Sequence, residues 1–476
     1  SCFLRQLPKQ NLAVQKKLKF MRLLQISKEL FYLVARTKPW NKKLFASKKN
    51  AVLIRESLER LGSVFVKLGQ MLALRPDFTP ALFCDELYKL LDQVPLFESK
   101  LAINILKREL GDNFPKLLEL NPNPLASASF AQVYKAKLAG GEVVAVKVQR
   151  PNIELIVHRD LAIMKIIAGA FDFWFRPTNK LVEVVEEFAV WTKAELNYSL
   201  EAANIKKFNE VAELIGDGIR GPKVYEEFIT PRVLTMEFID GYSLAQIISW
   251  LKEGKNKQLL DIGFVGKDII NKLIKNMLEA SHSHGFFHAD PHPANIIFTP
   301  EKELIFIDFG IVGHLTKKER VLILRYFRNL MAGNAEGSFD SLLELGSHKQ
   351  LNNISQIKKT YRALVDQFVA TFNAKTYLDQ QIKSGPILTQ TLRLMQSNGL
   401  KLPVSIIRYF KAFETVEGLI FALYPELQIQ DMLKEFRRVS IINIIDSLPA
   451  KLNKKSINSL MFKLIDSLEE KLLLDE

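Results

Sequence analysis

Cysteine and long apolar runs are scarce in this chain. Its 476 residues include two cysteines, Cys2 and Cys84, which cannot build a disulfide framework, so a reducing compartment is the simplest expectation. The longest stretch without a charged residue runs only from Leu120 to Tyr134, whereas a membrane-spanning helix needs about 20 apolar residues. We therefore expect no transmembrane helix, and we see no secretory signal. The composition, 48% hydrophobic and 25% charged, is that of a globular chain.

Acidic residues are rare near the N-terminus. Residues 1–60 hold 15 Lys and Arg against 3 Asp and Glu, a balance of 15 − 3 = +12, which leaves 14 − 12 = +2 for the remainder. Six apolar residues fall near one helix face, with most of the lysines off it: Phe20, Leu23, Leu24, Leu30, Phe31 and Val34. Such a basic amphipathic segment predicts either an anionic membrane surface as its partner or a helix that packs on the protein's own core. We expect no nucleic acid, because no reader motif accompanies the charge.

The order of the predicted elements indicates an α+β chain. Apolar spacing predicts helices over 51–110 and 152–215, and a mostly helical region from 261 onward. Strands are predicted at Phe130 to Leu138 and Val143 to Val148, around the turn Ala139-Gly140-Gly141-Glu142. Further strands are expected at Val224–Phe228, Arg232–Phe238, Ile296–Phe298 and Leu304–Ile307.

The most informative motif is Phe287-His288-Ala289-Asp290-Pro291-His292-Pro293-Ala294-Asn295, followed by Asp308-Phe309-Gly310. Protein kinases place a catalytic Asp five residues before a Mg²⁺-binding Asn, and a D-F-G Asp follows across a short hairpin. Asp and Asn supply the hard oxygen ligands that Mg²⁺ prefers. We interpret the crowded histidines as part of this loop rather than as a zinc site, because the kinase pattern also accounts for Asp290 and Asn295.

Two upstream features fit phosphoryl transfer from ATP. Val144-Ala145-Val146-Lys147 is close to the V-A-I-K strand, whose Lys contacts the α- and β-phosphates. A helix should supply a carboxylate that holds this Lys, and Glu195 and Glu201 are both candidates. The ordered set of Lys, Glu, Asp, Asn and Asp indicates a kinase-like fold far more strongly than any single motif.

Glycine is missing where a kinase has its Gly-rich loop. The chain has Ala126-Ser127-Ala128-Ser129 at this place, and alanine disfavours the positive φ that a Gly loop uses to approach phosphates. Ser127 and Ser129 still offer hydroxyl and backbone donors. After Asp308 the chain soon reaches Thr316-Lys317-Lys318-Glu319, a capping box that opens a helix. There is little room for an activation loop, so a docked protein substrate is not expected.

These motifs together resemble the UbiB/ADCK (aarF-type) family of atypical kinase-like proteins. The resemblance is carried by the K-x-G-Q motif at Lys67-Leu68-Gly69-Gln70, the Arg75-Pro76-Asp77 that follows it, the alanine-rich loop, Glu195-Leu196-Asn197 and the H-A-D-P-H-P-x-N loop. The segments from Asp85 to Pro95 and from Phe413 to Gly418 also resemble the sequences of this family. The resemblance covers roughly residues 50–430. Asn197 departs from it, because the family has an acidic residue there.

The resemblance implies a protein-kinase-like bilobal α+β fold with an N-terminal helical extension and an all-α C-terminal region. The expected segments are 1–50 (basic and amphipathic), 51–115 (the extension with K-x-G-Q), 116–238 (N-lobe-like), 239–330 (catalytic) and 331–476 (helical). Expected cofactors are ATP and Mg²⁺.

The resemblance also assigns a role to each site residue. Lys147 contacts the phosphates, with Glu201 as its helix partner, and Asp290 is the catalytic carboxylate. Asn295 and Asp308 bind Mg²⁺. The other expected nucleotide-site residues are Ala126, Ser127, Ala128 and Ser129 of the loop, Glu237 and Ile239 of the hinge, and Lys67, Gln70 and Glu195, with Glu195 as the partner of Lys67.

Three functions remain open at this point. The first is an ATP-dependent kinase or ATPase that supports ubiquinone (coenzyme Q) biosynthesis and acts on isoprenoid quinone precursors or on the proteins that handle them. It would work peripherally on the cytoplasmic or organelle-matrix face of a membrane. The second is a nucleotide-binding scaffold of a quinone-synthesis complex, without turnover. The third is an aminoglycoside- or choline-kinase-like phosphotransferase, against which the K-x-G-Q motif argues. A direct hydroxylase lacks a visible redox centre.

Overall fold

A computed structural model describes residues 9–37, 47–73, 79, 81–91, 96–175, 181–347, 353–371, 375–379 and 384–447. The chain divides into two compact units. The first comprises Ser1–Ala203 and Lys223–Phe238, and the second comprises Asn204–Pro222 and Ile239–Glu476. In the part of the chain that the structure describes, no helix is both long and apolar enough to cross a bilayer.

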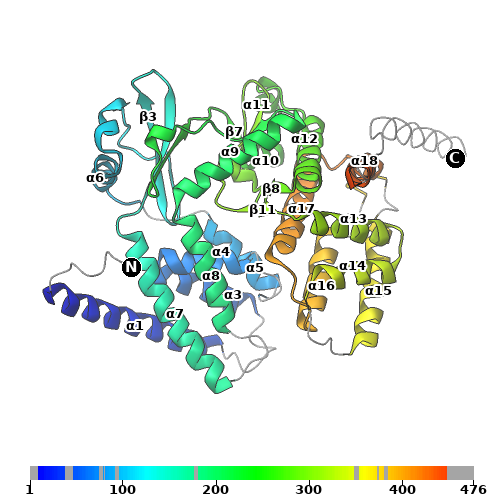
Figure 1. The fold of residues 1–476 in the computed structure, drawn as a ribbon, viewed down its shortest axis with the longest axis horizontal. Helices are drawn as coiled ribbons and strands as arrows, with labels where there is room; N and C mark the ends of the chain where they lie inside the picture. The colour runs from blue at the N-terminus through cyan, green and yellow to red at the C-terminus, as the bar shows by residue number, and fades with distance from the viewer. Residues whose placement is uncertain are drawn as a thin grey trace, which may run out of the picture. The chain divides into compact units, whose positions relative to one another are not determined.

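The first unit combines a group of helices with a small antiparallel sheet (Figure 1). Its helical elements are α1 (Lys9–Thr37), α3 (Lys48–Leu61), α4 (Ser63–Ala73), α5 (Ala81–Leu87), η2 (Tyr88–Leu91), α6 (Ser99–Leu110), η3 (Gly111–Lys116), α7 (Ile153–Phe175), α8 (Leu181–Glu195), the start of α9 (Tyr198–Ile215) and η4 (Glu226–Phe228). Its strands are β1 (Leu117–Leu118), β2 (Ala126–Ser127), β3 (Ala131–Leu138), β4 (Val143–Gln149) and β6 (Val233–Glu237). The order across the sheet is β1-β3-β4-β6, and β2 pairs with β3.

The β3–β4 hairpin confirms the strands and the turn expected from the sequence. Lys147 lies opposite Val133 on β3 and Leu234 on β6. Successive strand residues face opposite sides of a sheet. Val144, Val146 and Val148 therefore share one side, where they join a buried core with residues of α6, and Lys147 faces the other side.

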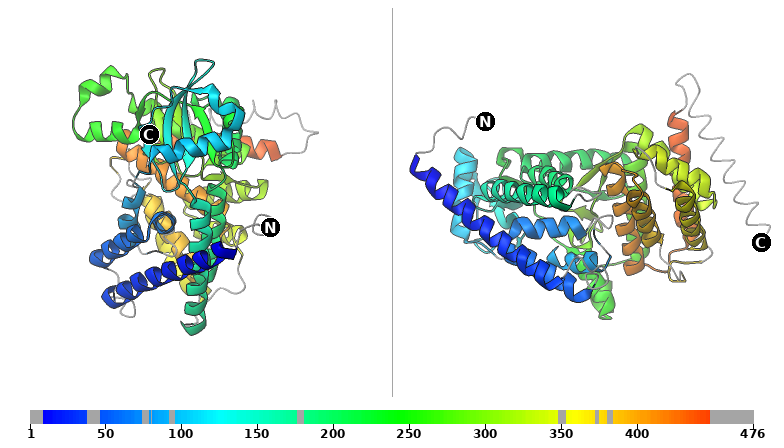
Figure 2. Two further views of the ribbon diagram at one scale, coloured as in Figure 1. Left: turned by 90° about the vertical axis from the view of Figure 1, so that its left-hand side faces the viewer. Right: turned by 90° about the horizontal axis from the view of Figure 1, so that it is seen from below.

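A second core of the first unit is built by helices. Residues of α1, α3, α4, α7 and α8 meet in it, together with Phe130 before β3. The α7–α8 hairpin is visible in Figure 1, and Figure 2 shows α1 alongside α3. Thus the segment that carries K-x-G-Q, on α4, is part of a packed helical body rather than a separate arm.

Only part of the apolar face that the sequence predicts on α1 is covered by the protein. Leu23 and Leu30 pack against the helical core, where Ile26 is fully buried. In contrast, the side chains of Phe20 and Phe31 are 60% and 76% exposed, and Leu24 and Val34 are exposed as well. One edge of α1 therefore packs on the protein's own core, and an anionic membrane surface as its partner stays a prediction.

The second unit carries two small sheets and many helices. Its strands are β5 (Ile219–Arg220), β7 (Tyr242–Ser243), β8 (Phe286–His288), β9 (Ile296–Phe298), β10 (Leu304–Phe306) and β11 (Val312–His314). One sheet has the order β5-β10-β9-β7, and β11 pairs with β8 in the other. The helical elements are the rest of α9, α10 (Leu244–Lys252), α11 (Asn256–Asp261), α12 (Gly266–Leu278), the π-helical turn η5 (Glu279–His284), η6 (Pro293–Asn295), α13 (Lys317–Met331), α14 (Ala335–Leu345), α15 (Ile354–Thr371), α16 (Ser384–Ser397), α17 (Val404–Leu423) and α18 (Ile429–Ser447).

The capping box at the start of α13 is present as expected. The Thr316 side chain accepts from the Glu319 backbone N–H, and the Glu319 carboxylate accepts from the Thr316 N–H. The strand expected at Val224–Phe228 is wrong. Only Val224 forms an isolated bridge, to Met236, and the chain then turns into the short 3₁₀ helix η4.

Candidate functional site

Lys147 and Glu201 form a buried ion pair in the first unit. The Lys147 Nζ lies 2.7 Å and 2.9 Å from the two carboxylate oxygens of Glu201. The Lys147 side chain is 15% exposed and the Glu201 side chain 5%. The strand alternation that turns Lys147 away from α6 directs it to α9, which carries Glu201 in its first turn. The ring of Tyr198, with its centroid 5.2 Å from Nζ, adds a cation–π contact.

The alanine-rich loop is held by hydrogen bonds to the neighbouring strands. Ala126 and Ser127 form β2, and the Ala128 N–H donates to Ala131 O at 2.9 Å. The guanidinium of Arg150, directly after β4, donates to Ser127 Oγ at 2.8 Å and to Ala128 O at 3.1 Å. Arg150 was not recognised from the sequence, because its role depends on this contact across 22 residues. Its pKa is lowered from the ordinary value because burial disfavours the charged guanidinium.

The K-x-G-Q motif lies on α4 and reaches both the loop and α8. Lys67 Nζ lies 2.5 Å from Glu195 Oε1, at the end of α8. Gln70 is buried, and its amide donates to Leu90 O at 3.0 Å and accepts from the Ser129 hydroxyl at 3.4 Å. The helix that carries the motif therefore lies beside the alanine-rich loop.

The glycine of this motif has a packing reason. A Cβ atom at Gly69 would lie 2.3 Å from Leu90 Cδ1 and 2.8 Å from Leu58 Cδ1. Both distances are shorter than carbon atoms tolerate, so only glycine lets α4 approach these two side chains this closely.

In the second unit, Asp290 follows β8 in a loop that His288 organises. The His288 Nδ1 accepts from the Asp290 N–H at 3.3 Å, so its Nε2 carries the proton and donates to Asp308 O at 2.5 Å. Burial lowers the pKa of His288, which favours this neutral form. The His292 Nδ1 similarly accepts from the Ala294 N–H. Both histidines therefore hold backbone groups of the loop, as the sequence interpretation expected.

Asn295 and Asp308 lie at the same end of the β9–β10 hairpin. Ile296 pairs with Phe306, and the Ile307 N–H donates to Asn295 O at 2.9 Å. One Asp308 carboxylate oxygen accepts from the Gly310 N–H. An amide and a carboxylate offer the hard oxygens that suit Mg²⁺, an ion that proteins hold with one or two such groups plus substrate phosphates. In the described residues no cluster of three or more His, Cys, Asp or Glu side chains could hold a metal by itself, which is compatible with this mode of binding.

The D-F-G phenylalanine is locked into an aromatic cluster. Phe309 is fully buried, and its ring centroid lies 5.1 Å from that of Phe208 on α9 and 5.2 Å from that of His288. Asn204, also on α9, donates its side-chain amide to Phe309 O at 3.1 Å. Sequence reasoning missed Asn204 and Phe208, because no motif marks them.

The expected hinge lies where the chain passes from the first unit to the second. Glu237 ends β6, opposite Val144, and its carboxylate accepts from the Lys223 N–H at 2.9 Å. Ile239 is the first residue of the returning second unit.

The structure thus brings together some of the expected site residues and leaves others in separate units. It pairs Lys147 with Glu201 and Lys67 with Glu195. It also places Asn295 and Asp308 at the same end of the β9–β10 hairpin. That all of them converge on one nucleotide stays a prediction. The motif residues Arg75, Pro76 and Asp77, and also Asp92 to Pro95, lie outside the described residues.

Comparisons with known proteins agree with this reading. Residues 89–341 match the ABC1 atypical kinase-like domain. An uncharacterized protein of Synechocystis sp. is 32% identical over 397 residues, covering 82% of this chain and 64% of the relative. The Arabidopsis thaliana protein named ACTIVITY OF BC1 COMPLEX KINASE 7, chloroplastic, is 30% identical over 381 residues, covering 80% of this chain and 53% of the relative. This chain therefore spans between about half and two thirds of the length of these curated relatives.

A solved structure is also similar. The complex of Rv3197 with erythromycin from Mycobacterium tuberculosis is 22% identical in sequence, with a TM-score of 0.47, and the match covers 75% of this chain and 91% of that one. The match to the ABC1 domain spans more than half of the present chain, and it includes the Lys147, Glu201, Asp290, Asn295 and Asp308 positions. The α+β, kinase-like fold expected from the sequence is confirmed, and the chain belongs to the ABC1 atypical kinase-like family, that of the UbiB/ADCK proteins.

Proposed function

We propose that this chain is an atypical kinase or ATPase of the UbiB type, which binds Mg-ATP and supports ubiquinone biosynthesis. The observation that carries the proposal is the buried Lys147–Glu201 ion pair between β4 and α9. Protein kinases need such a strand-lysine and helix-glutamate pair to hold the nucleotide phosphates. Relatives whose names call them kinases support the same activity.

The other site residues take the roles that this chemistry requires. Lys147 binds the α- and β-phosphates, and Asp290 orients the attacking hydroxyl or water. Asn295 and Asp308 would hold Mg²⁺, which neutralises charge on the phosphates when bound. The backbone from Glu237 to Ile239 holds the adenine.

Two features favour a small or lipid-like acceptor over a protein. Only seven residues separate Asp308 from the N-cap Thr316, so no long segment is available to dock a polypeptide. In the first unit, α4 contacts the alanine-rich loop through Gln70 and Ser129. These features support isoprenoid quinone precursors as acceptors, and the proteins that handle these precursors are proposed as binding partners rather than as phosphate acceptors.

The exposed apolar face of α1 supports peripheral attachment to an anionic membrane. Phe20, Leu24 and Phe31 are exposed in a segment where residues 1–60 carry a charge of 15 − 3 = +12. Basic helices with apolar residues on another face lie in the interface of anionic bilayers. The cytoplasmic or organelle-matrix face is proposed, and chloroplastic names among the relatives support an organelle.

ATP turnover by the purified chain tests the proposal. Mg-ATP should raise the melting temperature, and Asp308→Asn should abolish this shift. Slow ATP hydrolysis should be stimulated by anionic vesicles or by a phenolic quinone precursor, and it should be lost in Asp290→Asn. Ala126→Gly tests the alanine-rich loop. Glycine adopts a positive φ readily, as in the Gly-rich loop of protein kinases, so this variant should change the preference between nucleotides.

The outcomes separate enzyme from scaffold. If the chain binds Mg-ATP but shows no ATP hydrolysis that depends on Asp290, it acts as a nucleotide-binding scaffold of a quinone-synthesis complex rather than as an enzyme. A wild-type chain that Mg-ATP does not stabilise at all would contradict both.

A further inference from the structure

Both ends of one peptide group in the D-F-G turn are hydrogen-bonded. The Phe309 O accepts from the side-chain amide of Asn204 at 3.1 Å, and the Gly310 N–H donates to Asp308 Oδ1 at 3.0 Å. This carbonyl and this N–H belong to the same peptide bond, which is planar and trans, so they point in opposite directions. A contact that fixes the direction of the carbonyl therefore also fixes the direction in which the N–H meets the Asp308 carboxylate.

The donor of this contact lies on α9, outside the turn. Asn204 precedes Phe309 by 105 positions in the chain, and both residues belong to the second unit. Phe208, four residues after Asn204, packs its ring on that of Phe309, with 5.1 Å between the centroids. Residues i and i+4 lie on the same face of a helix. This face of α9 therefore contacts the turn twice, once with a ring and once with an amide donor.

The peptide group on the other side of Phe309 is held as well. His288 Nε2 donates to Asp308 O at 2.5 Å. The Phe309 side chain is fully buried, and a Cβ atom added at Gly221 would lie only 2.9 Å from its Cζ, so the ring is closely enclosed. Of the two side chains that hold the backbone of the turn, Asn204 is the one that acts on the peptide group bonded to the Asp308 carboxylate.

We propose that Asn204 is a positioning residue for Asp308 as a ligand of Mg²⁺, an inference that rests on the proposed function. Asn204 holds Phe309 O and so orients the Gly310 N–H, and this N–H limits the rotation of the Asp308 carboxylate. Mg²⁺ demands near-ideal octahedral geometry, so it binds less well to a carboxylate that rotates. Removing a group that orients a metal ligand typically lowers metal affinity by about 10–100-fold.

Hydrogen exchange of the chain without metal or nucleotide tests the first step. Asn204→Leu removes the donor with little change in side-chain volume, and Asn204→Ser puts a hydroxyl there that is too short to reach Phe309 O. In both variants the Gly310 N–H should exchange at least about tenfold faster, because its peptide group can rotate. Asn204→Gln keeps an amide donor and should restore most of the protection.

A Mg²⁺ titration in the presence of saturating ATP tests the second step. The Mg²⁺ concentration at the midpoint of the rise in melting temperature should increase about tenfold in Asn204→Leu. The affinity for ATP without Mg²⁺ should stay the same, because Asn204 acts through the Asp308 carboxylate. A purely structural role would lower the melting temperature at every Mg²⁺ concentration and would not move this midpoint.

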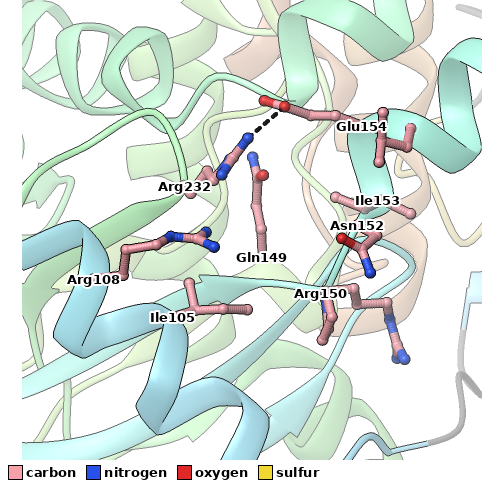
Figure 3. A pocket seen from close by; sticks show the side chains of 10 residues that line it. Ile105, Arg108, Gln149, Arg150, Asn152, Ile153, Glu154 and Arg232 are labelled. Atoms are coloured by element: carbon pink, nitrogen blue, oxygen red, sulfur yellow. Dashed lines mark hydrogen bonds and ion pairs between the residues drawn. The ribbon is translucent and has the colours of Figure 1, made fainter. Parts of the chain in front are cut away.

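Two variants control for a loss of stability alone. Asn398→Leu also deletes a side-chain amide that donates to a backbone carbonyl, that of Leu394 at 2.8 Å, after the end of α16 in the same unit. Glu154→Gln weakens the contact with Arg232 in the first unit, which Figure 3 marks with a dashed line. Both variants should leave the exchange of the Gly310 N–H and the Mg²⁺ midpoint unchanged.

The outcomes separate this inference from the proposed function. Exchange of the Gly310 N–H that Asn204→Leu and Asn204→Ser leave unchanged would overturn the inference alone. An unmoved Mg²⁺ midpoint in Asn204→Leu, when Mg-ATP stabilises the wild-type chain, would do the same. A wild-type chain that Mg-ATP does not stabilise would overturn the proposed function and this inference together.

Discussion

Removing the Glu201 charge should destabilise the first unit strongly. In Glu201→Gln, the Lys147 ammonium would lose both carboxylate contacts and face a neutral amide in a site where its side chain is 15% exposed, while the Tyr198 ring contact stays. Breaking a buried ion pair by removing one partner costs about 3–5 kcal/mol. The residual exposure and the ring contact put the expected loss near the lower end, at about 3 kcal/mol.

A double-mutant cycle isolates the interaction from other effects of the substitutions. Lys147→Met removes the ammonium group from the buried Glu201 carboxylate and should cost a similar amount. The double variant Lys147→Met with Glu201→Gln should recover most of the loss, giving a coupling energy of about 2–3 kcal/mol. Urea unfolding followed by circular dichroism measures the free energies, and hydrogen exchange of β4 assigns the transition to the first unit.

An exposed ion pair in the same unit provides the matched control. Lys116 and Glu227 lie 3.0 Å apart, but their side chains are 52% and 67% exposed. Glu227→Gln should therefore change the free energy of unfolding by no more than about 0.5 kcal/mol. If Glu201→Gln costs as little as this control, or if the two single losses simply add in the double variant, the reasoning from burial is wrong.

Three further predictions concern the second unit. Burial lowers the pKa of His282 to about 3; the unfolded imidazole takes up a proton below about pH 6.5, so stability falls as the pH drops from about 6.5 towards 3. In urea titrations, His282→Phe should reduce the fall in the free energy of unfolding between pH 7 and pH 5 by about 2 kcal/mol. Tyr409→Phe deletes only the hydroxyl that contacts His282, so that fall should persist in this variant. Gly221→Ala would put a Cβ atom 2.9 Å from Phe309 Cζ and should cost about 1–3 kcal/mol in the same assay; an unchanged midpoint would contradict the packing. Gly418→Ala, in α17 with open space around its Cβ, should raise the free energy of unfolding by about 0.5–1 kcal/mol, and a loss of stability would refute this.

Local patterns explain which parts of the fold were predictable. The alternation from Val143 to Val148 fixed a strand and placed Lys147 opposite the valines, because side-chain direction in a strand has a period of two residues. The capping box at Thr316 is local in the same sense. The expectation for Val224–Phe228 failed because apolar content alone does not decide between a strand and a short 3₁₀ turn.

The site residues that were missed depend on long-range contacts. Arg150 holds the alanine-rich loop from 22 positions away, and Asn204 reaches Phe309 across 105 positions. Neither role has a signature in the order of neighbouring residues.

The sequence by itself determined the chemical inventory of this protein: a strand lysine, helix carboxylates, a D-x-x-x-x-N loop and a D-F-G turn. Spacing along the chain carries that information, because these groups lie on short elements whose geometry is local. Spacing alone left both carboxylates open for Lys147; the tertiary structure pairs Glu201 with Lys147 and Glu195 with Lys67, as the family resemblance implies, and it decided how α1 divides its apolar residues between core and solvent. These choices depend on how helices pack against the sheet and against one another, since burial and partner are properties of neighbours that lie far apart in the chain.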